Sequence, residues 1–224
     1  MSRNPQQPTA LFLDFDGTIV SKDTAHIAMD RFGDPNWTRI DEALERGEVS
    51  FEESLRLEFA MLKVPKEVII KEVSPGTSLR PNFDRLVDYC KNNNVSLKVV
   101  SGGLDFCIRH FLDRADWLKF IEIHAPKSQF TGNGYSLTFP RMFTSSSTNF
   151  KDDLVKHARK NGATVFFVGD GFGDFSAAKE SDFAFAIKGS RLAELCREQR
   201  VPIQEMDDFN EVIDALNRRL RETK

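Results

Sequence analysis

The amino-acid sequence predicts an α/β fold with a doubly wound parallel sheet, and two observations carry this prediction. Over residues 81–224, short apolar runs alternate with amphipathic segments, which is typical of parallel strands covered by helices on both faces. Three apolar runs along the chain end in polar, glycine-containing turns. Because ligands bind beyond the carboxyl ends of the strands in such Rossmann-like sheets, we expect these turns to meet at one edge.

The first strand is predicted at residues 11–15, within the stretch ALFLDFDGTIV of residues 10–20. The run is apolar and breaks at Gly17, but it carries Asp14 and Asp16. Aspartate is unfavourable in strands, and a buried carboxylate is costly unless a cation or strong hydrogen-bond donors lie beside it. Two such residues at the carboxyl end of a core strand therefore predict a metal site.

No strand is predicted over residues 21–80, where four segments have helical spacing. Ser50 and Glu53 have the spacing of a capping box at the start of one of them. We expect this region to form a small all-helical cap inserted after the first strand, with residues 1–20 and 81–224 as the α/β core. The predicted cap helices are residues 23–32, 36–47, 50–63 and 65–73.

Regular alternation of helix and strand begins at residue 81. A Gly-Asn-Gly sequence in the middle of this region is typical of a tight turn and predicts a β-hairpin over residues 128–139. The other predicted strands are residues 95–100, 120–124, 163–168, 183–187 and 201–204, and the predicted helices are residues 81–93, 104–115, 149–161, 175–180, 190–197 and 208–221.

Composition and charge exclude several classes of protein. The chain has 224 residues and a net charge of −3, with its lysines and arginines scattered, so we expect no nucleic-acid or membrane partner. No apolar run approaches the roughly 20 residues of a membrane helix, and the polar start of the chain predicts a loose tail. Cys90, Cys107 and Cys196 are too far apart for a disulfide framework or a structural zinc site. We therefore expect a cytoplasmic protein, either monomer or homodimer.

The carboxylates at the predicted strand ends point to a bound cation. Asp14, Asp16, Asp170 and Asp174 would repel one another unless a hard divalent ion lay among them, and Mg²⁺ suits such sites together with phosphate oxygens. A phosphate ester is itself anionic, so a carboxylate nucleophile can approach it only if charge is screened. Each aspartate alone is more often an ordinary turn residue. Together they favour Mg²⁺ and a small phosphorylated metabolite.

Two further features suit an anionic phosphate group. Ser101 offers a hydroxyl, and Gly102 and Gly103 offer free backbone amides. Lys151 opens a predicted helix and could balance negative charge. Taken singly, a Ser-Gly-Gly sequence is usually a plain loop and a helical lysine is usually solvated. Their occurrence together with the aspartates, in order and at strand ends, favours a functional interpretation.

Four motifs resemble those of the haloacid dehalogenase superfamily: DFDGT at residues 14–18, SGG at 101–103, Lys151 and GDGFGD at 169–174. The helical insert is similar to the cap of the phosphoserine-phosphatase-like branch. The resemblance implies a Mg²⁺-dependent phosphatase that acts on a small phosphorylated metabolite through an aspartyl-phosphate intermediate.

The same resemblance implies roles for individual residues. Asp14 would be the nucleophile that becomes phosphorylated. Asp16 would protonate the leaving oxygen and later deprotonate the attacking water. Thr18, counted with the substrate-binding residues, would orient Asp16, and Ser101 and Gly102 would hold the phosphoryl oxygens.

The implied metal site uses the same strand ends. Mg²⁺ would be bound by the Asp14 carboxylate, the Asp16 backbone carbonyl and Asp170, with Asp174 in support. Lys151 would offset the charge on Asp14 and the phosphate, and it completes the implied catalytic set.

The resemblance leaves the substrate open. Three segments are similar to bacterial methionine-salvage phosphatases acting on 2-hydroxy-3-keto-5-methylthiopentenyl-1-phosphate, although TSSST replaces a cysteine-rich stretch at residues 144–148. Residues 47–62 are similar to the cap of phosphoserine phosphatases, but Glu58 stands near the position of an arginine that holds the substrate carboxylate in that family. The leading candidate substrate is the enol phosphate of methionine salvage, and phosphoserine or another small phosphate ester is the alternative. The three segments are residues 35–37, 101–106 and 195–199.

Asp16 also helps to distinguish a phosphatase from other classes of protein. An alkoxide leaves poorly without a proton, so phosphatases need an acid here, whereas dehalogenases lack it and cation-pumping ATPases have threonine. A non-hydrolytic, receiver-like phospho-acceptor is opposed by Asp16, since a general base there should speed loss of the phosphoryl group. A non-catalytic scaffold is opposed by the complete motif set.

The predicted cap helix at residues 50–63 carries four charged side chains that could line a closed pocket. For each of them we expect a solvated helix face rather than a pocket position. They are Glu52, Glu53, Arg56 and Glu58.

Overall fold

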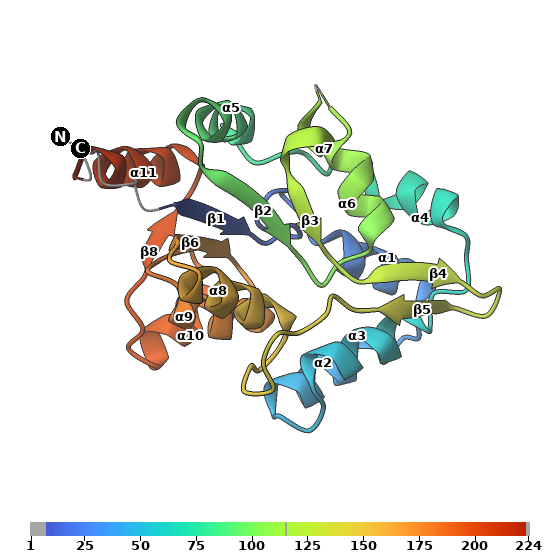
Figure 1. Cartoon of the computed structure of the whole chain (residues 1–224). Coiled ribbons are helices and arrows are strands. Elements are labelled where there is room, and N and C mark those ends of the chain that lie inside the picture. Colours follow the sequence, from blue (N-terminus) through green and yellow to red (C-terminus); the bar gives the residue numbers. More distant parts are fainter. Residues whose placement is uncertain (1–7, 115, 223–224) are drawn as a thin grey trace.

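A six-stranded parallel sheet forms the centre of the molecule, in the order β3-β2-β1-β6-β7-β8 (Figure 1). The computed structural model describes residues 8–114 and 116–222, so residues 1–7 of the predicted tail and residue 115 of a predicted helix lie outside the described residues. The parallel sheet confirms the predicted fold class. The strands are β1 Thr9–Leu13, β2 Ser96–Val100, β3 Glu122–His124, β6 Thr164–Gly169, β7 Phe183–Ile187 and β8 Gln204–Met206.

Alternate side chains of the strands enter two hydrophobic cores, one on each face of the sheet. On β1, Leu11 and Leu13 belong to one core, while Ala10 and Phe12 belong to the other. Helices α5 and α11 cover the first face, and α8, α9 and α10 cover the second (Figure 1). The core helices are α5 Phe83–Asn93, α6 Asp105–Leu112, α7 Trp117–Phe120, α8 Phe150–Lys160, α9 Phe175–Glu180, α10 Arg191–Glu198 and α11 Asn210–Glu222.

The register of the central strands places three strand ends side by side. In β1, Leu13 lies opposite Val99 of β2 and Val168 of β6. The residues that follow these positions therefore emerge at one edge of the sheet, as parallel pairing requires. This edge is where the three polar turns were predicted to meet.

Four helices occupy residues 21–80, as predicted: α1 Thr24–Phe32, α2 Thr38–Glu45, α3 Phe51–Phe59 and α4 Lys66–Val73. At the start of α3, the Ser50 hydroxyl accepts a hydrogen bond from the Glu53 amide at 3.2 Å. The helix ends at Phe59 rather than at residue 63, because the amides of Met61 and Leu62 donate to carbonyls three residues back and close a tight turn. The division of the chain into cap and core stays a prediction.

The predicted hairpin is present as β4 Lys127–Phe130 and β5 Tyr135–Thr138, and it lies beside α3 (Figure 1). The Tyr135 hydroxyl donates to the Val64 carbonyl at 3.1 Å, and Arg56 donates to the Leu137 carbonyl at 2.9 Å. A strand pair from the later part of the chain therefore packs against the inserted helices.

The last strand lies further along the chain than predicted. Pro202 has no amide hydrogen, and the Val201 amide donates to the Cys196 carbonyl at 2.8 Å at the end of α10. Residues 201–203 therefore cannot begin the ladder, and β8 starts at Gln204.

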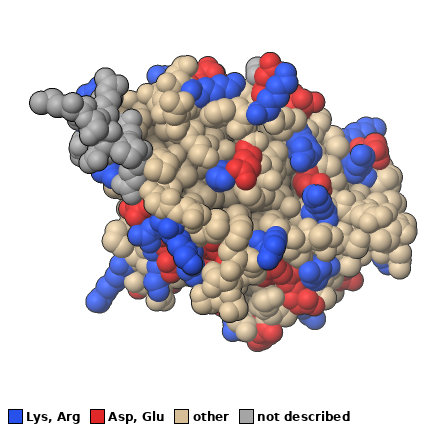
Figure 2. All heavy atoms as spheres, viewed as in Figure 1, with Lys and Arg blue, Asp and Glu red and all other residues tan. Residues whose placement is uncertain are grey.

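Charged side chains of both signs are interspersed over the face in Figure 2, with no continuous basic band across it. In the part of the chain that the structure describes, no helix is long and apolar enough to span a bilayer.

Candidate active site

The three polar turns line one cavity of about 400 Å³ at the carboxyl edge of the sheet, together with side chains from the inserted helices. This arrangement brings together Asp14, Asp16, Ser101, Gly102, Lys151, Asp170 and Asp174. Of the predicted site residues, only Thr18 does not line the cavity.

The turn after β1 is held by a glycine and by an arginine from outside the motif. Gly17 has a φ of +68°, and a Cβ there would lie 2.1 Å from an Asp170 carboxylate oxygen, so no other residue fits without displacing Asp170. Arg80 Nε donates to the Thr18 carbonyl at 2.7 Å. The sequence analysis missed Arg80, because nothing in its local pattern separates it from an ordinary loop arginine.

The Asp16 carboxylate has one bound oxygen and one free oxygen. Its Oδ1 accepts hydrogen bonds from the Thr24 amide at 2.7 Å and the Thr24 hydroxyl at 2.6 Å. Its Oδ2 is buried and has no hydrogen-bond partner among the described residues, and it lies 2.2 Å from where a Cβ of Gly103 would be. Burial, followed by the charge of Asp23, raises the pKa of Asp16 well above its usual value, so the protonated form is favoured.

The structure corrects the role expected for Thr18. Its side chain is fully buried, and its hydroxyl donates to Asp170 Oδ1 at 2.8 Å rather than to Asp16. Thr24, at the start of α1, holds Asp16 instead. Thr18 therefore positions Asp170 and has no access to a substrate. The family motif alone could not show which of these two aspartates the Thr18 hydroxyl contacts.

Lys151 joins two of the carboxylates. Its Nζ donates to Asp14 Oδ1 at 2.9 Å and to Asp174 Oδ1 at 2.7 Å, and its side chain is almost fully buried. Burial lowers the pKa of Lys151, but the charges of Asp14 and Asp174 more than offset this and raise the pKa above its usual value. The α8 terminus that carries Lys151 is fixed by Asn149, which accepts from the amides of Lys151 and Asp152.

Three carboxylates could hold a metal ion. Oxygen atoms of Asp14, Asp170 and Asp174 lie within 4.8 Å of one another. Burial and then the charge of Asp174 raise the pKa of Asp14 to about 7, although Lys151 acts against this. Burial and then the charge of Asp14 raise the pKa of Asp170 as well. A hard divalent cation would relieve this repulsion, and a set of carboxylate oxygens is the donor chemistry such an ion prefers.

Asp174 also has a structural task within this cluster. Its Oδ2 accepts hydrogen bonds from the amides of Asp170 and Gly171, each at 3.0 Å, while its Oδ1 accepts from Lys151. These contacts close the turn after β6 and fix Asp170 beside Asp14. The side chain of Asp16 is not part of the cluster, in keeping with a backbone contribution from that residue.

The turn after β2 offers donors to an anion. Ser101 Oγ accepts from the Gly103 amide at 3.0 Å, which leaves the hydroxyl hydrogen free to point elsewhere. The Gly102 amide has no hydrogen-bond partner within residues 8–114 and 116–222. Both residues line the cavity, so a hydroxyl and an amide donor face the same space as Asp14.

Phe51, the first residue of α3, covers the site from the cap side. A Cβ at Gly102 would lie 2.8 Å from the Phe51 ring, and a Cβ at Gly173 would lie 2.4 Å from it. Lys151 Nζ lies 5.6 Å from the ring centroid. The two motif glycines therefore give the ring room to pack directly on the catalytic turns, a contact that the sequence did not reveal.

The charged residues of α3 divide between the surface and the interior. Glu53 is exposed, as expected, but Glu58 is only 4% exposed and lines the cavity, so the solvated position expected for Glu58 is wrong. Glu52 accepts from the Phe150 amide at 3.0 Å, and Arg56 binds the hairpin. Burial and then the charges of Asp41 and Asp23 raise the pKa of Glu58 to about 8.

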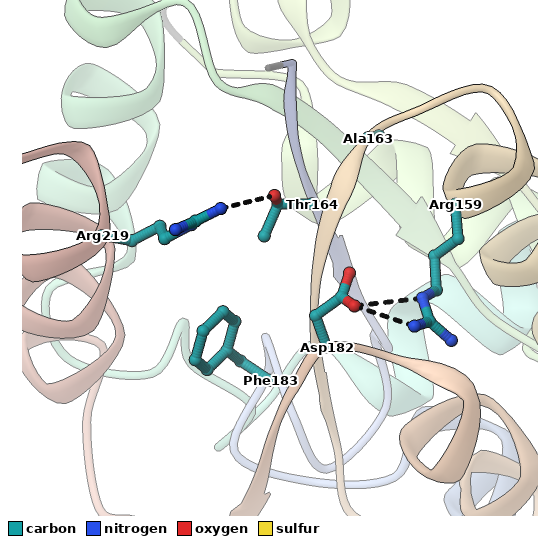
Figure 3. A pocket seen from close by; sticks show the side chains of 6 residues that line it. All are labelled: Arg159, Ala163, Thr164, Asp182, Phe183 and Arg219. Atoms are coloured by element: carbon teal, nitrogen blue, oxygen red, sulfur yellow. Dashed lines mark hydrogen bonds and ion pairs between the residues drawn. The ribbon is translucent and has the colours of Figure 1, made fainter. Parts of the chain in front are cut away.

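A second cavity, of about 530 Å³, lies at the opposite end of β6 and β7 (Figure 3). Asp182 pairs there with Arg159 at 2.9 Å, and Arg219 donates to the Thr164 hydroxyl at 3.4 Å. Thr164 begins β6, whereas Asp170 follows its last residue, so this cavity is remote from the carboxylates. Its acid is already paired with a base, and its lining places no second carboxylate beside the Thr164 hydroxyl.

Comparisons with known proteins identify the family of the chain. Residues 11–179 match the haloacid dehalogenase-like hydrolase family. The chain is 30% identical to the 2-hydroxy-3-keto-5-methylthiopentenyl-1-phosphate phosphatase of Brevibacillus brevis, over 92% of this chain and 94% of that protein. It is 31% identical to the enzyme of the same name from Geobacillus kaustophilus, over 93% of this chain and 95% of that protein.

Solved structures share the fold. A phospho-aspartyl intermediate analogue of phosphoserine phosphatase superposes with a TM-score of 0.71 at 21% identity, covering 93% of this chain and 99% of that one. A substrate-bound phosphoserine phosphatase gives a TM-score of 0.70 at 20% identity, covering 93% and 98% of the two chains. The resemblance predicted from the motifs is confirmed, and the chain belongs to the haloacid dehalogenase-like hydrolase family.

Proposed function

We propose that this chain is a Mg²⁺-dependent phosphomonoesterase that works through an aspartyl-phosphate on Asp14. The observation that supports this most is that a candidate nucleophile, Asp14, and a candidate general acid, Asp16, lie together at the end of β1. Asp14 is held by Lys151 at 2.9 Å, and Asp16, which lines the same cavity, keeps one carboxylate oxygen without a hydrogen-bond partner among the described residues. A nucleophile beside a cation and an acid with a raised pKa are what ester cleavage requires.

In the first half-reaction, a carboxylate oxygen of Asp14 attacks phosphorus and the bond from phosphorus to the ester oxygen breaks. The leaving oxygen takes the proton from Asp16 Oδ2, which the raised pKa of Asp16 keeps available. The Ser101 hydroxyl and the Gly102 amide donate to the phosphoryl oxygens as charge develops there. Lys151 balances charge on Asp14 throughout.

In the second half-reaction, water attacks the phosphorus of the aspartyl-phosphate. Asp16, now ionised, takes a proton from that water, and the bond between phosphorus and the Asp14 oxygen breaks. Inorganic phosphate leaves and Asp14 is restored. The two hydrogen bonds from Thr24 keep Asp16 Oδ1 fixed, so Oδ2 serves both proton transfers.

Asp14 and Asp170, with the backbone carbonyl of Asp16, would hold Mg²⁺, and Asp174 would support the site through the turn it closes. When bound, the ion screens the negative charges of the carboxylates and of the substrate phosphate. The crowding of buried acids around one cation, Lys151, supports the need for a further positive charge.

The leading substrate is 2-hydroxy-3-keto-5-methylthiopentenyl-1-phosphate, because relatives of that name align over nearly the whole chain. Phosphoserine is the alternative, since phosphoserine phosphatases share the fold. Glu58 weighs against it, because a substrate carboxylate would have to approach another buried carboxylate.

Phosphate release from a panel of esters, with Mg²⁺ and with EDTA, tests the proposal. The panel contains the enol phosphate, phosphoserine and p-nitrophenyl phosphate. We expect turnover that EDTA abolishes and Mg²⁺ restores, with the enol phosphate preferred over phosphoserine. Phosphate trapped on Asp14 without release from any ester would instead favour a non-hydrolytic phospho-acceptor.

A further inference from the structure

The cap wall of the active-site cavity is acidic. It is formed by the start of α1, by α2 and by α3, and the side chains of Asp23, His26, Asp41 and Glu58 line it. Two of its acids share one partner, because His26 Nδ1 lies 3.6 Å from Asp23 and His26 Nε2 lies 3.6 Å from Asp41. A third, Glu45, is paired with Arg191 at 2.8 Å.

Glu58 differs from these acids because it has no such partner. Within the described ranges, 8–114 and 116–222, its carboxylate makes no hydrogen bond and no ion pair, although only 4% of the residue is exposed. The charges that act on it, those of Asp41 and Asp23, are of the same sign. A carboxylate without a protein partner is costly to bury, and because Glu58 lines the cavity, a bound molecule can supply the missing partner.

The surroundings of Glu58 define what could satisfy it. An anionic group at this wall would be repelled by the carboxylates of Asp23 and Asp41, the same charges that act on Glu58. A hydroxyl or an ammonium group could donate a hydrogen bond to Glu58 and so supply the partner that its carboxylate lacks. The neighbouring lining includes Ala25, Leu44 and Leu55, which can contact a short carbon chain.

We propose that Glu58 selects the substrate by accepting a hydrogen bond from the tail of the phosphate ester and by excluding tails that carry a second negative charge. This inference rests on the proposed function and defines its substrate class: phosphate esters with a hydroxyl or ammonium group on a short chain. The enol phosphate named above belongs to this class, since its name specifies hydroxy, keto and methylthio groups and no carboxylate.

Esters that differ only at the end of the tail test the proposal. We would measure kcat/KM for 2-hydroxyethyl phosphate, phosphoethanolamine, propyl phosphate and phosphoglycolate, which present a hydroxyl, an ammonium, a methyl and a carboxylate. We expect the hydroxyl and ammonium esters to exceed propyl phosphate by about tenfold, and phosphoglycolate to fall about 100-fold below them.

The variants Glu58→Gln and Glu58→Arg separate charge from shape. Glu58→Gln should reduce the preference for phosphoethanolamine over propyl phosphate, and Glu58→Arg should raise kcat/KM for phosphoglycolate above its wild-type value. Glu53→Gln, on the exposed side of the same helix, is the matched control and should leave all four values unchanged.

The outcomes distinguish the two proposals. Hydrolysis of phosphoglycolate by the wild-type enzyme as fast as the hydroxyl ester would overturn the role of Glu58 while leaving the phosphatase intact. That wild-type comparison decides the matter even if a variant does not fold. Failure to hydrolyse any of these esters, the enol phosphate or p-nitrophenyl phosphate would instead remove the proposed function itself.

Discussion

The two walls of the active-site cavity are built on opposite principles. On the core wall, Lys151 donates to Asp14 and Thr18 donates to Asp170. Thr24 of α1 holds Oδ1 of Asp16, so each acid has a fixed donor and only the proton-transferring Oδ2 of Asp16 is left without one among the described residues. On the cap wall, Glu58 lines the cavity with no partner among the described residues. Fixed hydrogen bonds hold the reacting side chains in one geometry. A carboxylate without a protein partner can instead accept a hydrogen bond from the substrate.

The largest effect is expected from the core wall. Asp14→Asn should lower turnover by about 10⁴-fold or more, because an amide cannot serve as the nucleophile. The fold should survive, since the substitution removes one of several repelling charges. Phosphate release measures the loss, and circular dichroism checks the fold. Wild-type turnover in this variant would remove Asp14 from the mechanism.

Asp16→Asn should slow both half-reactions by about 10²- to 10⁴-fold, the usual size of general acid–base catalysis. Rapid-quench detection of aspartyl-phosphate would follow each step. Thr24→Val is the matched positioning variant: it retains the amide donor to Asp16, loses only the hydroxyl, and should cost about tenfold. Equal rates for wild type and Asp16→Asn would show that the proton comes from elsewhere.

Gly102→Ala tests the contact between the two walls. The new methyl group would lie 2.8 Å from the Phe51 ring and 3.0 Å from Leu55, so it should push α3 away while keeping the backbone amide. We expect kcat/KM to fall about tenfold. Adding Phe51→Leu should recover part of the loss by making room. If the double variant is no better than the single one, the cause lies in the turn and not in the cap.

The last effect is on stability rather than on turnover, and it concerns the pH dependence of the cap wall. The folded chain raises the pKa of Glu58 from 4.5 to about 8, so between these values the native state holds a proton that the unfolded chain has released. Stability should therefore fall as pH rises through this window. His26, Asp23 and Asp41 also face this region.

Chemical denaturation at about pH 5 and about pH 8 measures this dependence, and Glu58→Gln should weaken it by a few kcal/mol. The difference between wild type and variant isolates Glu58 from the other buried acids. Glu53→Gln should behave as wild type. An unchanged pH dependence in Glu58→Gln would mean that the carboxylate is ionised in the folded protein.

The sheet and the core wall were predictable from the sequence for the same physical reason. Parallel strands buried on both faces leave apolar runs, and the residues just after them must share one edge. Asp14, Ser101 and Asp170 could therefore be placed near one another without coordinates, whereas Lys151, at the start of a helix, was placed there by the family resemblance.

The cap wall was not predictable in this way. A helix shows only which residues share a face, and its packing partner decides which face is buried. Glu58 was therefore expected in solvent, although the structure buries it. The roles of Thr24 and Arg80 and the Thr18 contact with Asp170 likewise depend on how loops fold back. Short polar segments carry no periodic signal for such contacts.

The hairpin that packs on α3 has a consequence for how the protein is divided. Tyr135 and Leu137 of β5 are 4% and 7% exposed, partly because the inserted helices cover them. A variant that lacks residues 21–80 would expose this apolar strand face, which would then be prone to association with other chains. The same strand leads along the chain into α8 and Lys151. The hairpin that the inserted helices cover is thus separated from the catalytic lysine only by the loop of residues 139–149.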